Sequence, residues 1–282
     1  VLIAGGMATG GVVTSGCEIY DPATGAMSPT GSMTAMRMGH SLTELADGTV
    51  LATGGVSDYV DAANDLITVL NTAQDTAELY DPATGTWSPL ASAMSSPRSG
   101  HRQTTLDDGM VLITGGIDGA ITSPFGFGQP TYTSSCDLFD PATGTFAPTA
   151  PLLTGVAFHG QSLLADGRVL VTGGTMNDGS FVGIAVTQIC QAFDGANWLG
   201  TGSLDEPVVY HTQVPTKDGG ALVVGGLSGD FPAYVTSTQT GSHDGTLYTP
   251  GADIGLNVGF PNFTRPQGRG AHTQTQLYDG TW

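Results

Sequence analysis

Residues 40–55 read HSLTELADGTVLATGG, and three landmarks in this stretch decide the fold. His40 opens it, Asp47-Gly48 lies in its middle, and the doublet Gly54-Gly55 closes it. Asp-Gly favours a tight hairpin because both of its positions can adopt positive φ. The short apolar run before the glycine doublet is typical of a buried strand. The stretch therefore predicts two antiparallel strands joined by a short turn.

The same landmarks recur along the chain, and internal repetition of this kind indicates a repeat architecture. The repeated histidines are His40, His101, His159, His211 and His272. The doublets are Gly5-Gly6, Gly54-Gly55, Gly115-Gly116, Gly173-Gly174 and Gly225-Gly226, and in four copies the first glycine follows its histidine by 14 residues. A second segment, YDPATG at 20–25 and 80–85 and FDPATG at 139–144, predicts a turn with a capping Asp and a left-handed Gly.

Together these segments predict a four-stranded antiparallel repeat, whose strands we name A to D in chain order. Strand A begins after the histidine, and strand B contains the apolar run before the glycine doublet. Strand C ends at the aromatic-Asp pair, and strand D carries Trp87, Phe146 or Trp198. The repeat around Gly225-Gly226 lacks the Tyr-Asp-Pro segment, so the sequence does not define its outer strands.

The order of glycine doublet, aromatic-Asp pair and downstream Trp resembles the kelch repeat of bacterial secreted proteins, which forms one blade of a β-propeller. The resemblance covers nearly the whole chain and implies an all-β fold with five four-stranded blades in a single domain, 1–282. The expected blades are 272–282 with 1–33, 34–92, 93–151, 152–204 and 205–271. Strand A of the first blade, His272–Gly280, would join strands B to D from 1–33, which leaves no free sheet edge.

The closure of this ring depends on the C-terminus, which can be read in two ways. Leu277 and Asp279 keep the distances from their histidine seen in the stretch 40–55, which favours strand A. Alternatively, 277–282 forms a shortened hairpin of strands C and D. The chain begins on the strand-like run Val1–Ala4, and we expect a mature or trimmed chain.

In this topology the A–B and C–D turns share one face, and the B–C and D–A connections share the other. The first face has short, uniform turns. The second has long, irregular connections, which include 56–76, 117–135, 175–188 and roughly 248–270. Variable loops on a rigid scaffold commonly carry the function of a protein. We therefore expect a partner at the B–C and D–A loop face.

Charge excludes several classes of partner. Lys and Arg number 7 against 25 Asp and Glu, which gives a net charge of −18. Nucleic acids and anionic membrane surfaces attract clustered basic residues, so this balance argues against both. No apolar run is long enough to span a bilayer, and no membrane insertion is expected. Strong acidity with little Lys, together with the family resemblance, favours a secreted, periplasmic or cell-surface location.

The few arginines lie in register with one another. Arg37, Arg98 and Arg269 each stand three residues before a repeat histidine, and the other two repeats have Phe158 and Tyr210 one residue before theirs. We predict that these five residues line the mouth of the central channel and bind a ligand. The arginines would hold its carboxylate, phosphate or sulfate group. Alternatively, the arginines brace neighbouring blades through acidic groups.

The histidines and cysteines have structural interpretations. Five histidines at one repeat position indicate a hydrogen-bonding role in the scaffold rather than metal binding or catalysis. Cys17, Cys136 and Cys190 each lie three residues before the aromatic of strand C, where Ala77 stands in another copy. We expect small buried side chains and three free thiols, because equivalent places on different blades lie farther apart than a disulfide allows.

About half of the Asp residues belong to the repeated turns, and the rest concentrate in loops of the irregular face. The loop residues are Asp58, Asp61, Asp65, Asp118, Asp178 and Asp230. Such oxygen ligands can hold Ca²⁺. No Asp-x-Asp-x-Asp-Gly pattern occurs, however, so we interpret them as solvated loops and predict no cofactor or metal.

These observations predict a non-catalytic binding or scaffold module for a protein or glycan partner, with an anionic ligand at the channel mouth. The competing hypothesis is a secreted carbohydrate-active or galactose-oxidase-like enzyme that uses the same mouth. A glycosidase needs two facing carboxylates, and the candidates are only Glu44, Asp205 and Glu206. The oxidase needs paired Tyr and His ligands with a Tyr–Cys cross-link, which repetitive histidines and strand C cysteines do not supply.

Overall fold

The computed structural model describes residues 1–9, 11–58, 66–122, 128–179, 184–217, 219–228, 245–248 and 258–259. Within these residues the fold is all-β, with a single short helix, α1 (Leu66–Leu70). No helix in the described part of the chain is long and apolar enough to cross a membrane. The chain divides into two compact units, Val1–Pro148 and Thr149–Trp282. The prediction of one domain over 1–282 stays a prediction.

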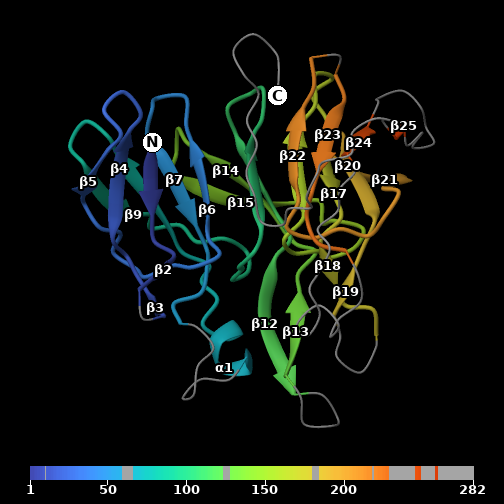
Figure 1. Ribbon diagram of the computed structural model, residues 1–282, viewed down its shortest axis with the longest axis horizontal. Coiled ribbons are helices and arrows are strands. Elements are labelled where there is room, and N and C mark those ends of the chain that lie inside the picture. The colour runs from blue at the N-terminus through green and yellow to red at the C-terminus, as the bar shows by residue number, and fades with distance from the viewer. Residues whose placement is uncertain are drawn as a thin grey trace. The chain divides into compact units, whose positions relative to one another are not determined.

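The first compact unit contains three antiparallel sheets of three or four strands (Figure 1). The first sheet consists of β1 (Leu2–Ala4), β4 (Cys17–Asp21) and β5 (Ala26–Thr30). The second consists of β6 (Ser41–Glu44), β7 (Val50–Thr53), β8 (Ala77–Asp81) and β9 (Thr86–Pro89). The third consists of β10 (Arg102–Thr105), β11 (Val111–Thr114), β14 (Cys136–Asp140) and β15 (Thr145–Thr149).

The second compact unit contains two further four-stranded sheets (Figure 1). The fourth sheet consists of β16 (Gly160–Leu163), β17 (Val169–Thr172), β20 (Ile189–Phe193) and β21 (Trp198–Ser203). The fifth consists of β22 (Thr212–Pro215), β23 (Ala221–Val224), β24 (Gly245–Tyr248) and β25 (Val258–Gly259).

Four of these sheets have the strand order predicted for A to D, with neighbouring strands antiparallel. The first sheet presents the counterparts of B, C and D. The predicted strand A for this sheet, His272–Gly280, lies outside the described residues, as do Asp61, Asp65 and Asp230 of the predicted acidic loops.

The connections between strands B and C contain secondary structure of their own. Three form two-stranded ribbons, made by β2 (Met7–Ala8) with β3 (Val12–Val13), β12 (Ile117–Thr122) with β13 (Gly128–Tyr132), and β18 (Thr175–Met176) with β19 (Ala185–Val186). The B–C connection of the second sheet contains α1 instead. The sequence predicted these connections only as long, irregular loops.

The A–B turn differs from its predicted form in one respect. The turn is closed by hydrogen bonds from the Leu45 amide to the Thr49 carbonyl and from the Gly48 amide to the Leu45 carbonyl. Gly48 has a φ of 84°, but Asp47 does not share the positive φ that we expected of both positions. Its Oδ1 instead accepts a hydrogen bond from the Thr49 amide at 2.9 Å. This side-chain bond fixes a longer turn in which only glycine needs the left-handed conformation.

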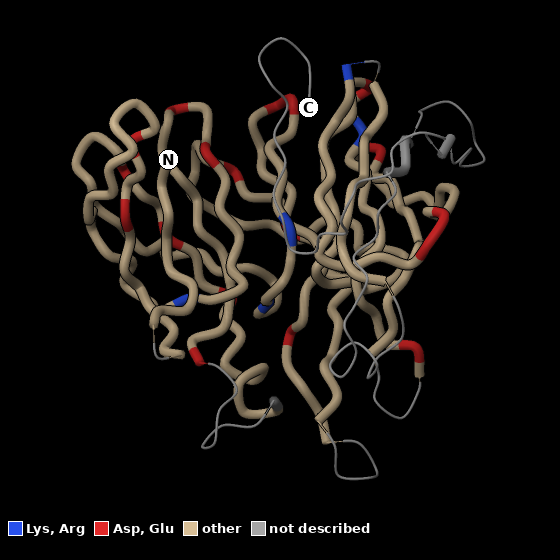
Figure 2. The backbone as a smooth tube through the Cα atoms, in the orientation of Figure 1, with Lys and Arg blue, Asp and Glu red and all other residues tan. Residues whose placement is uncertain are grey.

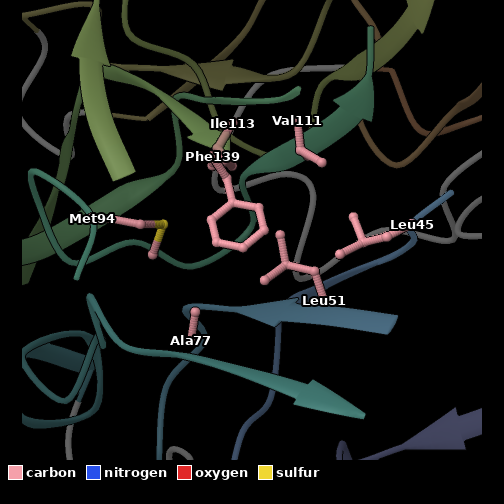
Figure 3. Close-up of a cluster of buried hydrophobic side chains, with 7 residues drawn as sticks. All are labelled: Leu45, Leu51, Ala77, Met94, Val111, Ile113 and Phe139. Carbon is pink, nitrogen blue, oxygen red and sulfur yellow. The ribbon is translucent and has the colours of Figure 1, made fainter. Parts of the chain in front are cut away.

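Strands B and C supply the core because both of their faces are covered. Figure 3 shows one cluster between the second and third sheets, in which Phe139 packs among side chains from β7, β8 and β11. Its members are Leu45, Leu51, Ala77, Met94, Val111, Ile113 and Phe139, all buried. The aromatic landmarks of strands C and D also meet, as in the pair Phe139–Phe146, whose ring centroids are 4.9 Å apart. The repeated residues of the sequence are thus contact partners in the sheets.

Cys17, Cys136 and Cys190 are free and buried, as the sequence predicts. Each thiol donates to the carbonyl two residues before it, at 3.4 Å, 3.6 Å and 3.7 Å respectively. Burial raises the pKa of Cys17, and it raises the pKa of Cys190 to about 12. The reactive thiolate form is therefore scarce at neutral pH.

We predict that the native protein reacts with an excess of iodoacetamide at none of its cysteines within an hour at pH 8. Three labels should appear by mass spectrometry once the chain is unfolded in guanidinium without reductant. Rapid labelling of Cys190 in the native state, or fewer than three labels after unfolding, would contradict the buried free thiols.

Three glycine doublets contact the segment that leads into the following sheet. The Gly55 amide donates to the Arg98 carbonyl at 2.8 Å, and the Gly6 amide donates to the Arg37 carbonyl at 2.7 Å. Gly174 makes the same bond to the Val208 carbonyl, at 2.7 Å. We call this contact, with the histidine beside it, the doublet interlock.

The histidine completes the interlock from the side. His101 Nε2 lies 2.8 Å from the Thr53 hydroxyl of the preceding sheet, and His211 Nε2 lies 3.0 Å from the Thr172 hydroxyl. These contacts give the repeat histidines the scaffold hydrogen bonds that the sequence indicated. A Cβ on Gly54 would meet the Arg98 carbonyl and lie 2.7 Å from the His101 ring. Glycine is therefore required at this position by close approach as well as by its φ of 63°.

Gly54→Ala should destabilise the protein far more than Gly48→Ala. Both glycines have positive φ, which costs an alanine about 1–2 kcal/mol. A Cβ on Gly48 meets nothing within 4 Å, whereas one on Gly54 collides with backbone. We expect a loss of about 1 kcal/mol for the control and of more than about 3 kcal/mol for Gly54→Ala, measured by urea unfolding. Equal losses would show that the interlock is not tightly packed.

Candidate functional site

The Arg37 side chain is 1% exposed and is held by polar groups of the second sheet. Its Nε donates to Glu78 Oε1 at 3.1 Å, and its Nη1 donates to the Gly54 and Thr76 carbonyls at 2.7 Å and 3.0 Å. The other Glu78 oxygen accepts bonds from the Thr34 amide and hydroxyl at 2.6 Å and 2.8 Å. Guanidinium and carboxylate thus fasten the link between β5 and β6 to strand β8.

Arg98 repeats this arrangement one sheet later and is 0% exposed. Its Nη2 donates to Asp137 Oδ2 at 2.6 Å, while its Nη1 donates to the Gly115 and Ser135 carbonyls at 2.9 Å and 3.0 Å. Asp137 also accepts bonds from the Ser95 amide and hydroxyl. The link between β9 and β10 is therefore fastened to β14.

Because both ion pairs are buried, each charge needs its partner. Burial lowers the pKa of Arg37 and of Arg98, and the charges of Glu78 and Asp137 oppose that shift. Removing one partner of such a pair leaves an uncompensated charge in a low-dielectric interior, which costs about 3–5 kcal/mol.

The carboxylate partner has a sequence signal that the register of arginines alone did not reveal. Glu78 and Asp137 each lie two residues before the aromatic residue of strand C in their sheets. In the fourth sheet that position is Gln191 and the arginine position is Val156, which is buried. Gln191 exchanges hydrogen bonds with the Thr154 backbone instead. The second and third sheets thus have both the arginine on the link and the carboxylate on strand C, whereas the fourth sheet has neither.

These contacts favour the bracing interpretation of Arg37 and Arg98. Their guanidinium groups face strand C, inside the sheet, where a dissolved anion does not reach them. Arg269 lies outside the described residues. Anion binding by the three arginines stays a prediction without support from the described contacts.

Phe158 and Tyr210 form a contact pair in the second compact unit. Their ring centroids lie 4.8 Å apart at 44°, and the Tyr210 amide donates to the Phe158 carbonyl at 3.4 Å. Both side chains are half-buried. The structure thus brings together the two aromatic residues that the sequence analysis placed in one site.

The backbone of this aromatic pair is strained. Phe158 and Tyr210 each have a φ of 55°, and among the described residues they alone combine a positive φ with a side chain. The corresponding residues of the second and third sheets are Gly39 and Gly100, with φ of 67° and 63°. The left-handed conformation costs a bulky residue about 1–2 kcal/mol, whereas an aromatic contact returns about 0.5–1.5 kcal/mol beyond area burial. The contact between the rings alone does not offset the strain of two such residues.

The B–C connections of the second and third sheets contact each other. The Ala120 amide in β12 donates to Asn71 Oδ1, just after α1, at 3.0 Å. A Cβ on Gly128 of β13 would lie 2.7 Å from the Ile67 side chain, so helix and ribbon are in close contact. On this ribbon Ile121 remains 54% exposed. We call α1, β12 and β13 together the loop platform (Figure 1).

The acidic candidates come from different compact units. Within the described residues no group of three or more His, Cys, Asp or Glu side chains is arranged to hold a metal ion. Glu44 lies at the end of β6, whereas Asp205 and Glu206 lie after β21, and all three are exposed. Turn residues such as Asp21, Asp81 and Asp140 accept hydrogen bonds within their own turns, as predicted.

Comparison with known proteins places the chain by fold alone. No protein family matches the sequence, and no curated protein matches it. A solved structure of the protein YjhT is similar, with a TM-score of 0.65 and 16% sequence identity. The similarity covers 88% of this chain and 78% of that one. At this identity the two chains share a fold, and no functional residue is transferred from one to the other.

Asp137→Asn should destabilise the protein by about 3–5 kcal/mol, because it leaves the Arg98 charge buried without its counter-ion. The exposed pair Arg168–Asp166, with side chains 30% and 39% exposed, provides the control. Arg168→Ala should cost less than about 1 kcal/mol. Guanidinium unfolding measures both. A loss below 1 kcal/mol for Asp137→Asn would remove the bracing interpretation.

His40 should make stability depend on pH. Burial, and then the Arg37 charge, lower the pKa of His40 from 6.5 to about 4. Between pH 6.5 and about pH 4, His40 is protonated in the unfolded chain but neutral in the folded chain. The free energy of unfolding therefore decreases as the pH falls through this range. The loss between pH 7 and pH 4 should reach about 3 kcal/mol.

The matched variant is His40→Asn, which cannot titrate in this range. Urea unfolding of both proteins at pH 7, 5.5 and 4.5 gives the comparison. The wild-type protein should lose more stability than the variant at each lower pH. Parallel curves for the two proteins would mean that His40 titrates normally in the folded state.

Proposed function

We propose that the five sheets are the blades of a kelch-like β-propeller, closed by pairing of His272–Gly280 with β1. The support is the repeated order of strands and their constant register. The residue after each histidine faces the residue before the glycine doublet, as in Ser41 with Thr53 and Arg102 with Thr114. In the described part of the first sheet β1 pairs with β4 alone, whereas its counterpart β7 pairs on both sides.

This proposal predicts one specific disulfide. The second residue after the histidine faces the residue two before the doublet, as in Leu42 with Ala52. Ile3→Cys with Gln274→Cys should therefore oxidise to a cross-link in a background where the native cysteines are alanine. The control pairs Gln274→Cys with Tyr20→Cys in strand C. Cross-linking of the control alone, or of neither pair, would contradict closure by this strand.

We propose further that the protein is a non-catalytic binding or scaffold module that presents its loop end to a protein or carbohydrate partner. The observation that carries the proposal is the contrast between the two ends of the sheets. At one end lie short turns that use their own Asp oxygens for closure. At the other end the B–C connections are built out into ribbons and a helix.

The loop platform supports this reading because it builds out the loop end of the sheets, with Val69, Leu70 and Ile117 buried and Ile121 left exposed. Its helix and ribbon come from different sheets and are joined by the Ala120–Asn71 bond. Exposed Ile121 adds apolar area of the kind that binding surfaces use. The net charge of −18 disfavours nucleic acid and anionic lipid as partners. A secreted, periplasmic or cell-surface location fits this proposal.

A glycan array tests the binding function. The wild-type protein should retain a defined subset of glycans, and Ile121→Asp should reduce retention at least tenfold because it charges the loop platform. Leu199→Asp, at a residue 50% exposed on β21, is the matched control and should bind as the wild type does.

The array also distinguishes the enzyme hypothesis. Release of shortened sugars or of oxidised product from the array would point to catalysis and contradict the proposal. Equal loss of retention in both variants would move the binding surface away from the loop platform.

A further inference from the structure

The Phe158–Tyr210 pair occupies a position where the scaffold itself accepts glycine. Gly39 and Gly100 hold the same backbone place before the histidine, with φ within about 12° of the aromatic pair. The bond between successive sheets is also the same, because the Gly100 amide donates to the Gly39 carbonyl at 2.8 Å. The aromatic side chains are therefore an addition to the scaffold rather than a requirement of it. Strained residues of this kind concentrate at ligand sites.

In the second compact unit the basic and acidic residues described below lie at opposite ends of the strands. Arg168 lies in the turn after β16 and Lys217 in the turn after β22, whereas Phe158 and Tyr210 precede these strands. The two described cations of the second compact unit thus lie at the end opposite the pair. Asp178 lies in the connection after β18, and Asp205 and Glu206 lie in the connection after β21, both at the pair's own end. Acidic positions predominate over basic ones along the described backbone (Figure 2). Among the described residues of the second compact unit, the connections at the pair's end thus carry carboxylates and no Lys or Arg.

We infer that the Phe158–Tyr210 pair is a binding platform for a cationic group, such as an alkylammonium or a guanidinium of a ligand or partner side chain. The faces of aromatic rings carry negative electrostatic potential and attract cations within about 6 Å. A ring pair would also stack against a sugar, but the distribution of charge selects a cation. The inference rests on the proposed binding function and names the ligand chemistry of one of its sites.

The test compares choline with 3,3-dimethylbutan-1-ol, which has the same shape without the charge. Chemical-shift titration of the intact protein should show choline at the Phe158 and Tyr210 rings with at least fivefold higher affinity than the alcohol. Phe158→Gly with Tyr210→Gly should abolish this difference while the thermal midpoint stays within a few degrees, because glycine is the residue that this backbone position favours. Tyr20→Ala, which removes an exposed tyrosine of the first compact unit, should bind choline normally.

A second variant keeps the test decisive if the glycine protein does not fold. Phe158→Leu with Tyr210→Leu retains bulk without the aromatic faces and should also lose choline. Equal affinity for the neutral alcohol, preference for methyl glucoside, or choline binding that survives in the leucine variant would overturn the inference. If the wild-type protein retains glycans but does not bind choline, the inference fails and the proposed binding function stands. If it binds choline but retains no glycans, only the proposed binding function fails.

Discussion

In three doublets the second glycine donates a hydrogen bond to a carbonyl before the next histidine, and this is the contact on which the structure depends. Gly6, Gly55 and Gly174 each make it within their own compact unit. The contact needs a doublet without Cβ atoms, since the His101 ring leaves no space beside Gly54 and a Cβ on Gly55 would lie 3.0 Å from His40. The contact links one sheet to the segment that starts the next. Residues that recur along the sequence therefore join successive sheets in the structure. The histidine and the glycine doublet, held at a constant spacing, act together in this contact.

The buried ion pairs strengthen the same connections between sheets. They have a structural role and are not available to bind a ligand. Arg37 and Arg98 hold the links that the interlock reaches, through Glu78 and Asp137. Where the arginine is Val156, neutral Gln191 takes the place of the carboxylate. Charged residues that looked available to a ligand are thus used internally. Among the described residues, the loop platform and the aromatic pair are the surfaces that we propose for a partner.

The extent of prediction from sequence follows from how local each feature is. Strand order and turn positions were predicted because Asp, Gly and apolar runs act over a few neighbouring residues. The partners of Arg37 and Arg98 lie 41 and 39 residues away, and the arginine register alone did not indicate them. The ribbon β12–β13 has no periodic signal, so it was predicted only as a loop. The positive φ of Phe158 follows from its alignment with Gly39, because glycine is the residue that a left-handed position favours.

Native-state hydrogen exchange of the doublet amides tests the interlock most directly. The amides of Gly6, Gly55 and Gly174 should exchange only through global unfolding, with the same free energy as the core amide of Ile113 in β11. The Ala120 amide in the ribbon should exchange at a clearly lower free energy, because opening the loop platform leaves the sheets intact. Doublet amides that exchange as readily as Ala120, while Ile113 stays protected, would show that the sheets do not depend on this contact.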